Sequence, residues 1–386
     1  MTLLRTSSLL CVGLLALACG PKQPPTPPAP PPEPVEEPEP VDPIPAEFGA
    51  LTPHLLVNDV AAAAEFYGQA LAAETVYTLP SPDGSITMYA ELRIGDSTLM
   101  LSAASEQAKG PMMLGGSPVR LMLYVEDADA AFQSAVDAGA IAEMPVADQF
   151  WGDRYGAFID PFGHAWAVST HVEDLTPEQM MQRAEIVNSK KKKRRKKKGK
   201  PAWAQIEGTP ATQKVPEEYH TITLSLTVKG AADAIDFYTN VFGATERARM
   251  PIPDGRLMHA EVQLGDTVLM LADEFPEMGA VSATTLGGSP VTLHHYVQDA
   301  DATHAKAVES GANEVSGVEQ QFWGDRYGEL TDPTGIPWGV ATQVENVTPE
   351  QMLERLQAMG QPEGGHEETP AEGEAEAPAE AAAEAG

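Results

Sequence analysis

The chain has 386 residues and a formal net charge of −31, with only two cysteines. The length allows two or three domains, and the negative balance argues against nucleic acid as a partner. Both cysteines, Cys11 and Cys19, lie near the N-terminus, which excludes disulfides, thiolate catalysis and cysteine metal sites from the remainder of the chain.

Residues 1–18 have the form of a secretory signal, because Arg5 precedes an apolar stretch that is too short to span a bilayer as a helix. The end of this stretch, ALAC, resembles a bacterial lipobox, which implies cleavage before Cys19 and a lipid on that residue. A plain secretory signal with an incidental cysteine is the alternative. Residues 19–48 are acidic and rich in Pro, and we expect an extended tether of about 3 Å per residue. The expected location is the bacterial cell envelope, lipid-anchored and facing the periplasm or the outer surface.

One octapeptide, QFWGDRYG, occurs at Gln149–Gly156 and again at Gln321–Gly328. Shorter motifs, LGGSPV and TPEQM among them, recur in the same order around both copies. The period is too long for a solenoid, so each copy should fold as a domain. In chain order, we expect a domain at 49–187, a basic linker at 188–215, a domain at 216–360 and an acidic Ala/Glu-rich tail at 361–386 that is disordered.

The first domain has the same order of elements twice: one strand, one helix and three strands. Ala-rich or apolar helical patterns follow the first strand of each unit, and turn residues separate the strands. A last helix begins at Pro177 after the capping residue Thr176. The expected strands are 51–57, 74–79, 86–93 and 98–102 in the first unit and 119–125, 141–144, 155–159 and 165–170 in the second, with helices at 60–71, 128–138 and 177–187.

The second domain repeats this order with a cleaner alternation of polar and apolar residues. Three of its strands each place polar side chains on one face. These faces predict either the lining of a ligand-binding cup or the wet face of a one-sided antiparallel sheet. The polar sets are Thr221, Thr223, Ser225 and Thr227; His259, Glu261 and Gln263; and Thr292, His294 and Tyr296.

Paired βαβββ units, with Phe-Tyr in the first helix and Asp-Pro-x-Gly before the last strand, resemble the vicinal oxygen chelate superfamily of glyoxalases and bleomycin resistance proteins. Motifs such as QFWGDRYG and LTPEQM look like its PhnB-like branch. The resemblance covers 49–187 and 216–359. It implies an α+β fold of two tandem domains, each of two βαβββ units forming a cupped mixed sheet, and an internal pseudo-dimer of the two domains.

The resemblance also identifies where a metal would bind. Metal-dependent members place two His and two Glu in the cup, and the residues at those positions here are neither His nor carboxylate. Such side chains cannot hold a divalent ion in water, so we predict no metal and no other cofactor, and no residue can be assigned to catalysis. The positions are Thr52, Met100, Arg120 and Ala167 in the first domain and Thr223, Met270, Thr292 and Gly339 in the second.

Candidate ligand contacts come from the polar strand faces and from the octapeptides. A histidine in a cleft could act as a general base, although a lone histidine on a strand is more often structural. In the octapeptide, Trp151 and Arg154 either form a stacking wall and an anion clamp at the cup rim, or pack at a domain interface and tie the loop to a strand while Asp153 caps the turn. The candidates are His54, Tyr89, Arg120, Trp151, Arg154, His259, His294, Tyr296, Trp323 and Arg326.

Three functions fit these observations, and whether the chain is an enzyme stays open. The favoured one is an envelope lipoprotein that binds or sequesters a small organic ligand in one or both cups. The first alternative is a glyoxalase-like lyase or isomerase with an unusual site. The second is an envelope scaffold, in which the basic cluster Lys190–Lys200 contacts anionic lipid or an envelope polymer.

Overall fold

The computed structural model describes residues 41–190 and 201–359. The expected signal, Cys19, most of the tether, the basic stretch after Lys190 and the acidic tail lie outside these residues. Within the described ranges, no helix is both long and apolar enough to cross a membrane.

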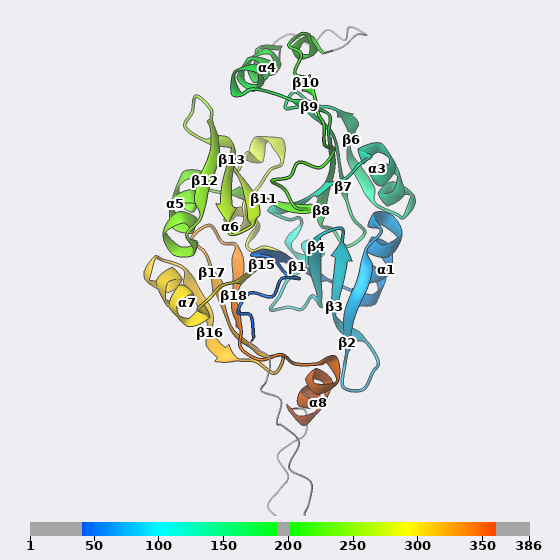
Figure 1. Cartoon of the computed structure of the whole chain (residues 1–386), viewed down its shortest axis with the longest axis vertical. Coiled ribbons are helices and arrows are strands. Elements are labelled where there is room, and N and C mark those ends of the chain that lie inside the picture. The colour runs from blue at the N-terminus through cyan, green and yellow to red at the C-terminus, as the bar shows by residue number, and fades with distance from the viewer. Residues whose placement is uncertain (1–40, 191–200, 360–386) are drawn as a thin grey trace, which may run out of the picture. The chain divides into compact units, whose positions relative to one another are not determined.

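The strands form two eight-stranded mixed sheets (Figure 1). The strand order is β16-β17-β18-β15-β1-β4-β3-β2 in the first and β12-β13-β14-β11-β5-β8-β7-β6 in the second. The first sheet comprises β1 (Leu51–Val57), β2 (Glu74–Pro80), β3 (Thr87–Ile94), β4 (Ser97–Ala103), β15 (Val291–Tyr296), β16 (Asn313–Gln320), β17 (Asp325–Thr331) and β18 (Pro337–Gln343). The second comprises β5 (Val119–Tyr124), β6 (Ile141–Asp148), β7 (Asp153–Ile159), β8 (Ala165–His171), β11 (Ile222–Val228), β12 (Thr245–Pro251), β13 (Leu257–Leu264) and β14 (Thr267–Asp273).

The α+β class and the βαβββ order of both repeats are confirmed. The structure corrects one detail: the two units in each sheet come from different repeats. β1 of the first repeat pairs antiparallel with β15 of the second, and β11 pairs in the same way with β5 (Figure 1). The edge strand of one unit can pair with a unit of its own repeat or with a unit of the other repeat. The alternation of polar and apolar residues therefore does not reveal which unit is the partner.

Helices cover one face of each sheet. α1 (Val60–Leu71) and α7 (Ala300–Glu309) pack on the first sheet, and α3 (Ala128–Asp137) and α5 (Ala231–Phe242) pack on the second. The cores between helices and strands join into one hydrophobic cluster. The remaining helices are α2 (Pro111–Leu114), α4 (Pro177–Lys190), α6 (Ala283–Leu286), α8 (Pro349–Met359) and the short 3₁₀ turns η1 (Ala202–Gln205) and η2 (Pro276–Met278).

The family motifs hold the two units of a repeat together from one sheet to the other. Tyr67 of the Phe-Tyr motif donates its hydroxyl proton to Asp160 of the Asp-Pro-x-Gly motif at 2.6 Å, and Trp166 Nε1 donates to the same carboxylate at 3.0 Å. Tyr238 and Asp332 repeat this arrangement at 2.7 Å. Because a buried carboxylate needs hydrogen-bond donors, these motifs are explained by structure and do not define a site.

The tether and the linker were both expected to be extended spacers, but the C-terminal part of each packs against the folded repeats. Residues 41–48 of the tether lie against the first sheet, where Thr98 and Thr52 donate hydrogen bonds to the carbonyls of Glu47 and Phe48, both at 2.6 Å. Residues 201–215 of the linker lie beside α4, and β9 (Glu173–Asp174) pairs there with β10 (Thr209–Pro210). Hydrogen bonds to and from the main chain thus fix parts of both segments, although their composition predicts solvated chain.

Candidate binding cups

Each sheet has a second face, opposite its helices, where polar and aromatic side chains gather. We call this face of the first sheet the histidine cup and that of the second sheet the arginine cup. The strand exchange brings candidates from both repeats into the histidine cup: His54, Tyr89, His294 and Tyr296 lie on its strands β1, β3 and β15. Arg120 and His259 belong to the arginine cup, on β5 and β13.

His54 and His294, which belong to different repeats, share one cup. In the β1–β15 register, Thr52 faces His294 and His54 faces Thr292, so the two imidazoles are diagonal neighbours on the same face. His54 Nε2 lies 2.6 Å from Ser102 Oγ, and the His54 ring meets the edge of Tyr89 with centroids 6.0 Å apart. Strand exchange therefore creates a pair that the separate repeats do not suggest.

His294 lies among aromatic rings at the centre of the histidine cup. It is 7% exposed, and its ring stacks on Tyr327 at 5.5 Å and 15° and lies 4.7 Å from the ring of Tyr296. Its Nε2 is buried and has no hydrogen-bond partner among the described residues. Buried polar atoms are nearly always paired, so this unpaired nitrogen is an exception that needs an explanation.

Three carboxylates line the same cup, and sequence reasoning did not single out any of them as a candidate. Asp325 accepts hydrogen bonds from Tyr296 at 2.8 Å and from Trp323 Nε1 at 3.0 Å. Glu91 and Glu329 each accept from the tyrosine two residues before them, at 2.8 Å. Alternation along β3 and β17 is the signal that could have found them, because a residue two positions from a cup-lining tyrosine shares its face.

Burial sets the charges in the histidine cup. It lowers the pKa of His54 to about 4, and together with the neighbouring His54 and His295 it lowers the pKa of His294 to about 3. Burial also raises the pKa of Glu91 and of Asp325. At neutral pH both imidazoles are therefore uncharged and can accept a proton or a hydrogen bond, and both carboxylates bind protons more readily than in water.

The arginine cup is filled by its own side chains. Met122, Tyr124, Ala157, Ala167 and Met270 form an apolar cluster on it. Tyr219, which precedes β11, stacks on Tyr124 with centroids 5.0 Å apart and donates to Glu261 at 2.8 Å. Arg120 forms an ion pair with Glu143 at 2.8 Å, and His259 one with Glu261 at 3.0 Å. These contacts leave the arginine cup with internal partners for its charges.

The octapeptide divides between the two faces of each sheet. Its arginines point away from the cups: Arg154 forms ion pairs with Asp129 and with Asp148, the latter at 2.9 Å, and Arg326 pairs with Asp301 at 2.6 Å. These contacts fasten β7 and β17 to the first turns of α3 and α7, which supports the structural interpretation of the two arginines.

The tryptophans and the aspartates of the octapeptide lie on the cup side. Trp151 and Trp323 meet the edges of Tyr155 and Tyr327, at 5.6 and 5.8 Å. The expected turn-capping role of Asp153 is replaced by contacts to the next strand, because its side chain accepts from Ser169 at 2.8 Å and meets His171 Nδ1 at 2.8 Å.

The residues at the family's metal positions do not fit a divalent ion. In the histidine cup, the positions are Thr52, Met100 and Gly339 with Thr292 from β15. A Cβ added at Gly339 would lie 2.6 Å from the Tyr327 hydroxyl, so this ring fills the space that a glutamate ligand would need. Across the described ranges, no group of three or more His, Cys, Asp or Glu is placed to hold a metal. The absence of a metal nevertheless stays a prediction.

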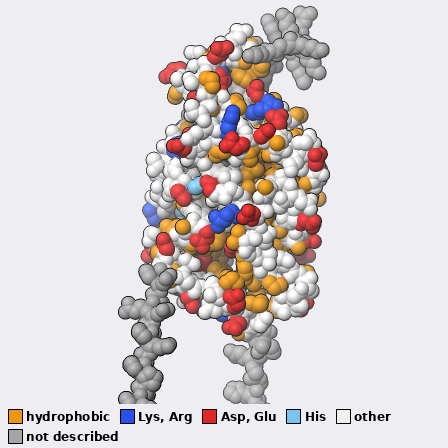
Figure 2. All heavy atoms as spheres, turned by 45° about the vertical axis from the view of Figure 1, so that its right-hand side comes forward, with side chains coloured by type: hydrophobic (Ala, Val, Ile, Leu, Met, Phe, Trp, Pro, Cys, Tyr) orange, Lys and Arg blue, Asp and Glu red, His pale blue; other side chains and the backbone are white. Residues whose placement is uncertain are grey.

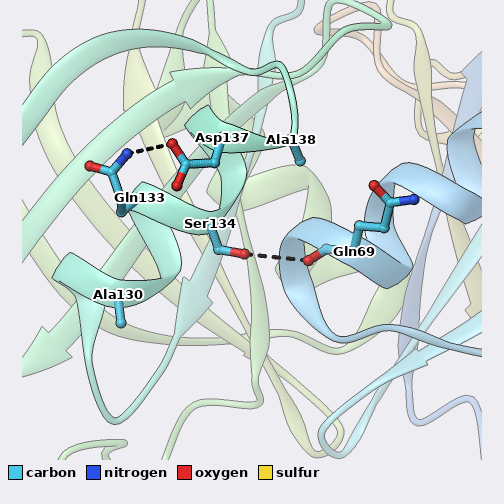
Figure 3. A pocket seen from close by; sticks show the side chains of 6 residues that line it. All are labelled: Gln69, Ala130, Gln133, Ser134, Asp137 and Ala138. Carbon is cyan, nitrogen blue, oxygen red and sulfur yellow. Dashed lines mark hydrogen bonds between the residues drawn. The ribbon is translucent and has the colours of Figure 1, made fainter.

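The outer surface has a shallow hollow away from the cups. Figure 3 shows a shallow hollow between α1 and α3, where Ser134 donates to the carbonyl of Gln69 at 3.3 Å and Gln133 donates to Asp137 at 2.7 Å. Its polar groups bond to one another and join the helices of two units. On the face seen in Figure 2, acidic and basic side chains are interspersed and apolar ones lie between them.

Two sheets of paired βαβββ units, each with a polar cup, define a glyoxalase-like class of protein. The profile of the glyoxalase/bleomycin resistance protein/dioxygenase superfamily matches residues 49–168 and 220–340. The chain belongs to this superfamily.

Individual relatives resemble one repeat or the fold of the whole. An uncharacterised protein of Mycobacterium tuberculosis is 41% identical over 138 residues, which is 35% of this chain and 81% of that protein. An uncharacterised Arabidopsis thaliana protein is 30% identical over 125 residues, 31% of this chain and 75% of that protein. Glyoxalase I of Zea mays is similar at the level of the fold, with a TM-score of 0.50, 12% identity, and 81% of this chain and 96% of that chain covered.

Proposed function

We propose that this chain is a small-molecule-binding protein and that its binding site is the histidine cup. The observation that carries the proposal is the buried Nε2 of His294, which has no partner among the described residues and belongs to a ring packed against Tyr296 and Tyr327. An organic ligand with one hydrogen-bonding group at this nitrogen and an apolar body against Tyr296 and Tyr327 would satisfy it.

The contrast between the cups supports one ligand per chain. At the positions equivalent to His54 and His294, the arginine cup has Ser225 and Met122. Met122 belongs to the apolar cluster that occupies that cup. Phe48 lies on Tyr296 in the histidine cup as Tyr219 lies on Tyr124 in the arginine cup. The cups therefore differ at the position of His294, where the histidine cup has an unpaired polar atom and the arginine cup has a packed Met.

Native mass spectrometry of the purified chain tests the proposal. We expect one retained organic compound per chain, and the variant His294→Met, which installs the residue of the other cup, should lose it. Met122→Leu in the arginine cup is the matched control and should retain it. Retention that survives His294→Met, or that Met122→Leu abolishes, would place the site elsewhere.

A second candidate function is a lyase or isomerase reaction in the same cup. The observation in its favour is the diagonal pair of His54 and His294, both uncharged at neutral pH, in a cup that Glu91 also lines. Neutral imidazoles beside carboxylates can move protons on a bound substrate. Turnover of a methylglyoxal–thiol adduct that His54→Ala or His294→Ala abolishes would support catalysis, whereas binding without turnover would leave only the first function.

We also propose that the protein is held at the bacterial envelope by a lipid on Cys19. Support comes from the ALAC motif, the apolar stretch before it and the Pro-rich segment after it. Metabolic labelling with palmitate should mark the wild-type chain and leave Cys19→Ser unlabelled. Labelling of Cys19→Ser, or a soluble wild-type chain in fractionated cells, would contradict the anchor.

A further inference from the structure

We infer that the ligand of the histidine cup is an organic cation, either a protonated amine or a quaternary ammonium compound. The inference rests on the proposed binding function of that cup. It comes from comparing the carboxylates of the two cups, which occupy equivalent places in the two sheets.

The aspartate of the octapeptide has an internal cation in one cup only. In the arginine cup, Asp153 faces His171 across the β7–β8 pair, and His171 Nδ1 lies 2.8 Å from its carboxylate. Asp153 and the nearby Asp174 raise the pKa of His171 to about 9, so that it is charged at neutral pH. In the histidine cup, Asp325 faces Gln343 in the same register. Asp325 is 2% exposed and receives only neutral donors, Tyr296 and Trp323, among the described residues.

The glutamate of the third strand shows the same difference. In the arginine cup, Glu261 lies 3.0 Å from His259 Nε2, a basic group on the same strand. Its equivalent, Glu91, receives the hydroxyl of Tyr89 instead. Arg93, two residues further along the same strand, acts on Glu91 electrostatically, and the acidic Glu47 and Asp325 oppose it.

A further exchange adds a carboxylate to the histidine cup, because Ala157 of the arginine cup is replaced by Glu329. The Arg120–Glu143 ion pair of the arginine cup is replaced as a pair, by Thr292 and Val315. A carboxylate that is removed from water without a cation is unfavourable unless it takes up a proton. The buried Asp325, which has no cation among the described residues, therefore indicates a positive charge supplied by a bound ligand.

The rings around these carboxylates suit the same kind of ligand. Phe48 lies 5.3 Å from Tyr296, and Trp323 lies 5.8 Å from Tyr327, so four aromatic side chains border Asp325 and His294. Aromatic faces attract ammonium groups, most strongly where water is excluded. In the tautomer with the proton on Nδ1, the unpartnered Nε2 of His294 can accept a hydrogen bond from the N–H of a protonated amine or from the hydroxyl of choline.

Calorimetric titration of the purified full chain tests the charge of the ligand. The probes are choline, its uncharged analogue 3,3-dimethylbutan-1-ol and the anion 3,3-dimethylbutanoate, which share a branched head of similar shape. We expect choline to bind about tenfold or more tightly than the alcohol, and the anion to show no binding. Glu91→Gln should weaken choline binding by about tenfold, and Asp325→Asn should do the same if its melting curve shows that it folds.

Glu261→Gln in the arginine cup is the matched control and should leave choline affinity unchanged. A proton linkage adds a second readout: because burial raises the pKa of Glu91 and Asp325, cation binding should release protons, and choline affinity should fall as the pH is lowered. Equal or tighter binding of the alcohol or the anion would overturn the cation inference and leave the proposed binding function intact. If no probe binds, native mass spectrometry separates the two proposals. A retained neutral or anionic compound overturns only the cation inference, whereas the absence of any retained compound overturns the binding function as well.

Discussion

At Gly339 the histidine cup leaves no room for a Cβ atom while Tyr327 keeps its position. The ring of Tyr327 lies over it, held by stacking on His294 and by the hydrogen bond to Glu329. The equivalent residue of the arginine cup is Ala167, which coexists with Tyr155. Tyr327 therefore packs directly against the main chain at Gly339, whereas Tyr155 leaves room for the methyl group of Ala167.

Gly339→Ala should therefore destabilise the protein by about 1–3 kcal/mol, the usual cost of overpacking a well-ordered site. Urea denaturation measures this change. Tyr327→Ala in the same chain should recover part of the loss, because it removes the ring that the new methyl group meets. If Gly339→Ala is as stable as the wild type, the ring does not occupy this position.

The buried imidazoles predict a loss of stability in acid. The pKa of His294 is about 3 in the folded chain and about 6.5 when unfolded, so between these values the unfolded chain binds more protons. The stability that comes with the neutral ring is complete above pH 6.5 and falls, as the pH decreases, by up to about 1.4 kcal/mol per pH unit. His294→Met should flatten this acid limb in denaturant titrations between about pH 7 and 4. An unchanged slope would mean that the ring is hydrated.

His171 predicts a pH dependence of stability with the opposite sign, a loss at high pH. Its pKa is about 9 when folded, because Asp153 and Asp174 hold the proton. Its contribution is complete below pH 6.5, the unfolded value, and is lost as the pH rises through 9. Thermal melting between these pH values should show a decline in the wild type that is absent in His171→Gln, a change that copies Gln343 of the other sheet. A decline that persists in the variant would have another cause.

At the scale of elements, alternation and turn residues predicted the helices and strands that the first repeat contributes to the sheets, and the second repeat follows the same order. The largest error is β6, expected at 141–144 and found at Ile141–Asp148. It contains Pro145, which counts against a strand in sequence, yet β6 is an edge strand, where a missing N–H breaks no ladder. The ends of the tether and linker were missed for a similar reason, since their order comes from distant main-chain partners that composition does not reveal.

The candidate residues show the same limit. His54, Tyr89, His294 and Tyr296 were predicted one strand at a time, because each strand shows its own period. Which of them meet depends on the pairing of β1 with β15, and that pairing joins residues of different repeats. Alternation reports the face of a sheet and carries no information about the neighbouring strand, so the histidine pair and its carboxylates could be assembled only in three dimensions.

At the scale of the whole molecule, the two repeats are not separate structural units, because each sheet contains strands of both. Each sheet is completed by the other repeat, so a separated repeat would expose the edges of two central strands, β1 and β5 in the first. Unpaired central strands with apolar faces pair with any matching edge in solution. A first repeat expressed alone should therefore dimerise or aggregate. In the dimer, a second copy of the first repeat would take the place of the missing second repeat in each sheet.

Cleavage of the intact protein gives the sharpest test of this interleaved arrangement. A specific protease site introduced between residues 191 and 200 separates the repeats in sequence without touching the sheets. We expect the two fragments to remain together in size-exclusion chromatography and to part only in denaturant, because the β1–β15 and β11–β5 pairs and the shared core still join them. The uncut protein with the same insertion is the control for the elution volume. Fragments that separate in native buffer would show that each repeat closes its own sheet, and the shared cup with His54 beside His294 would then not exist.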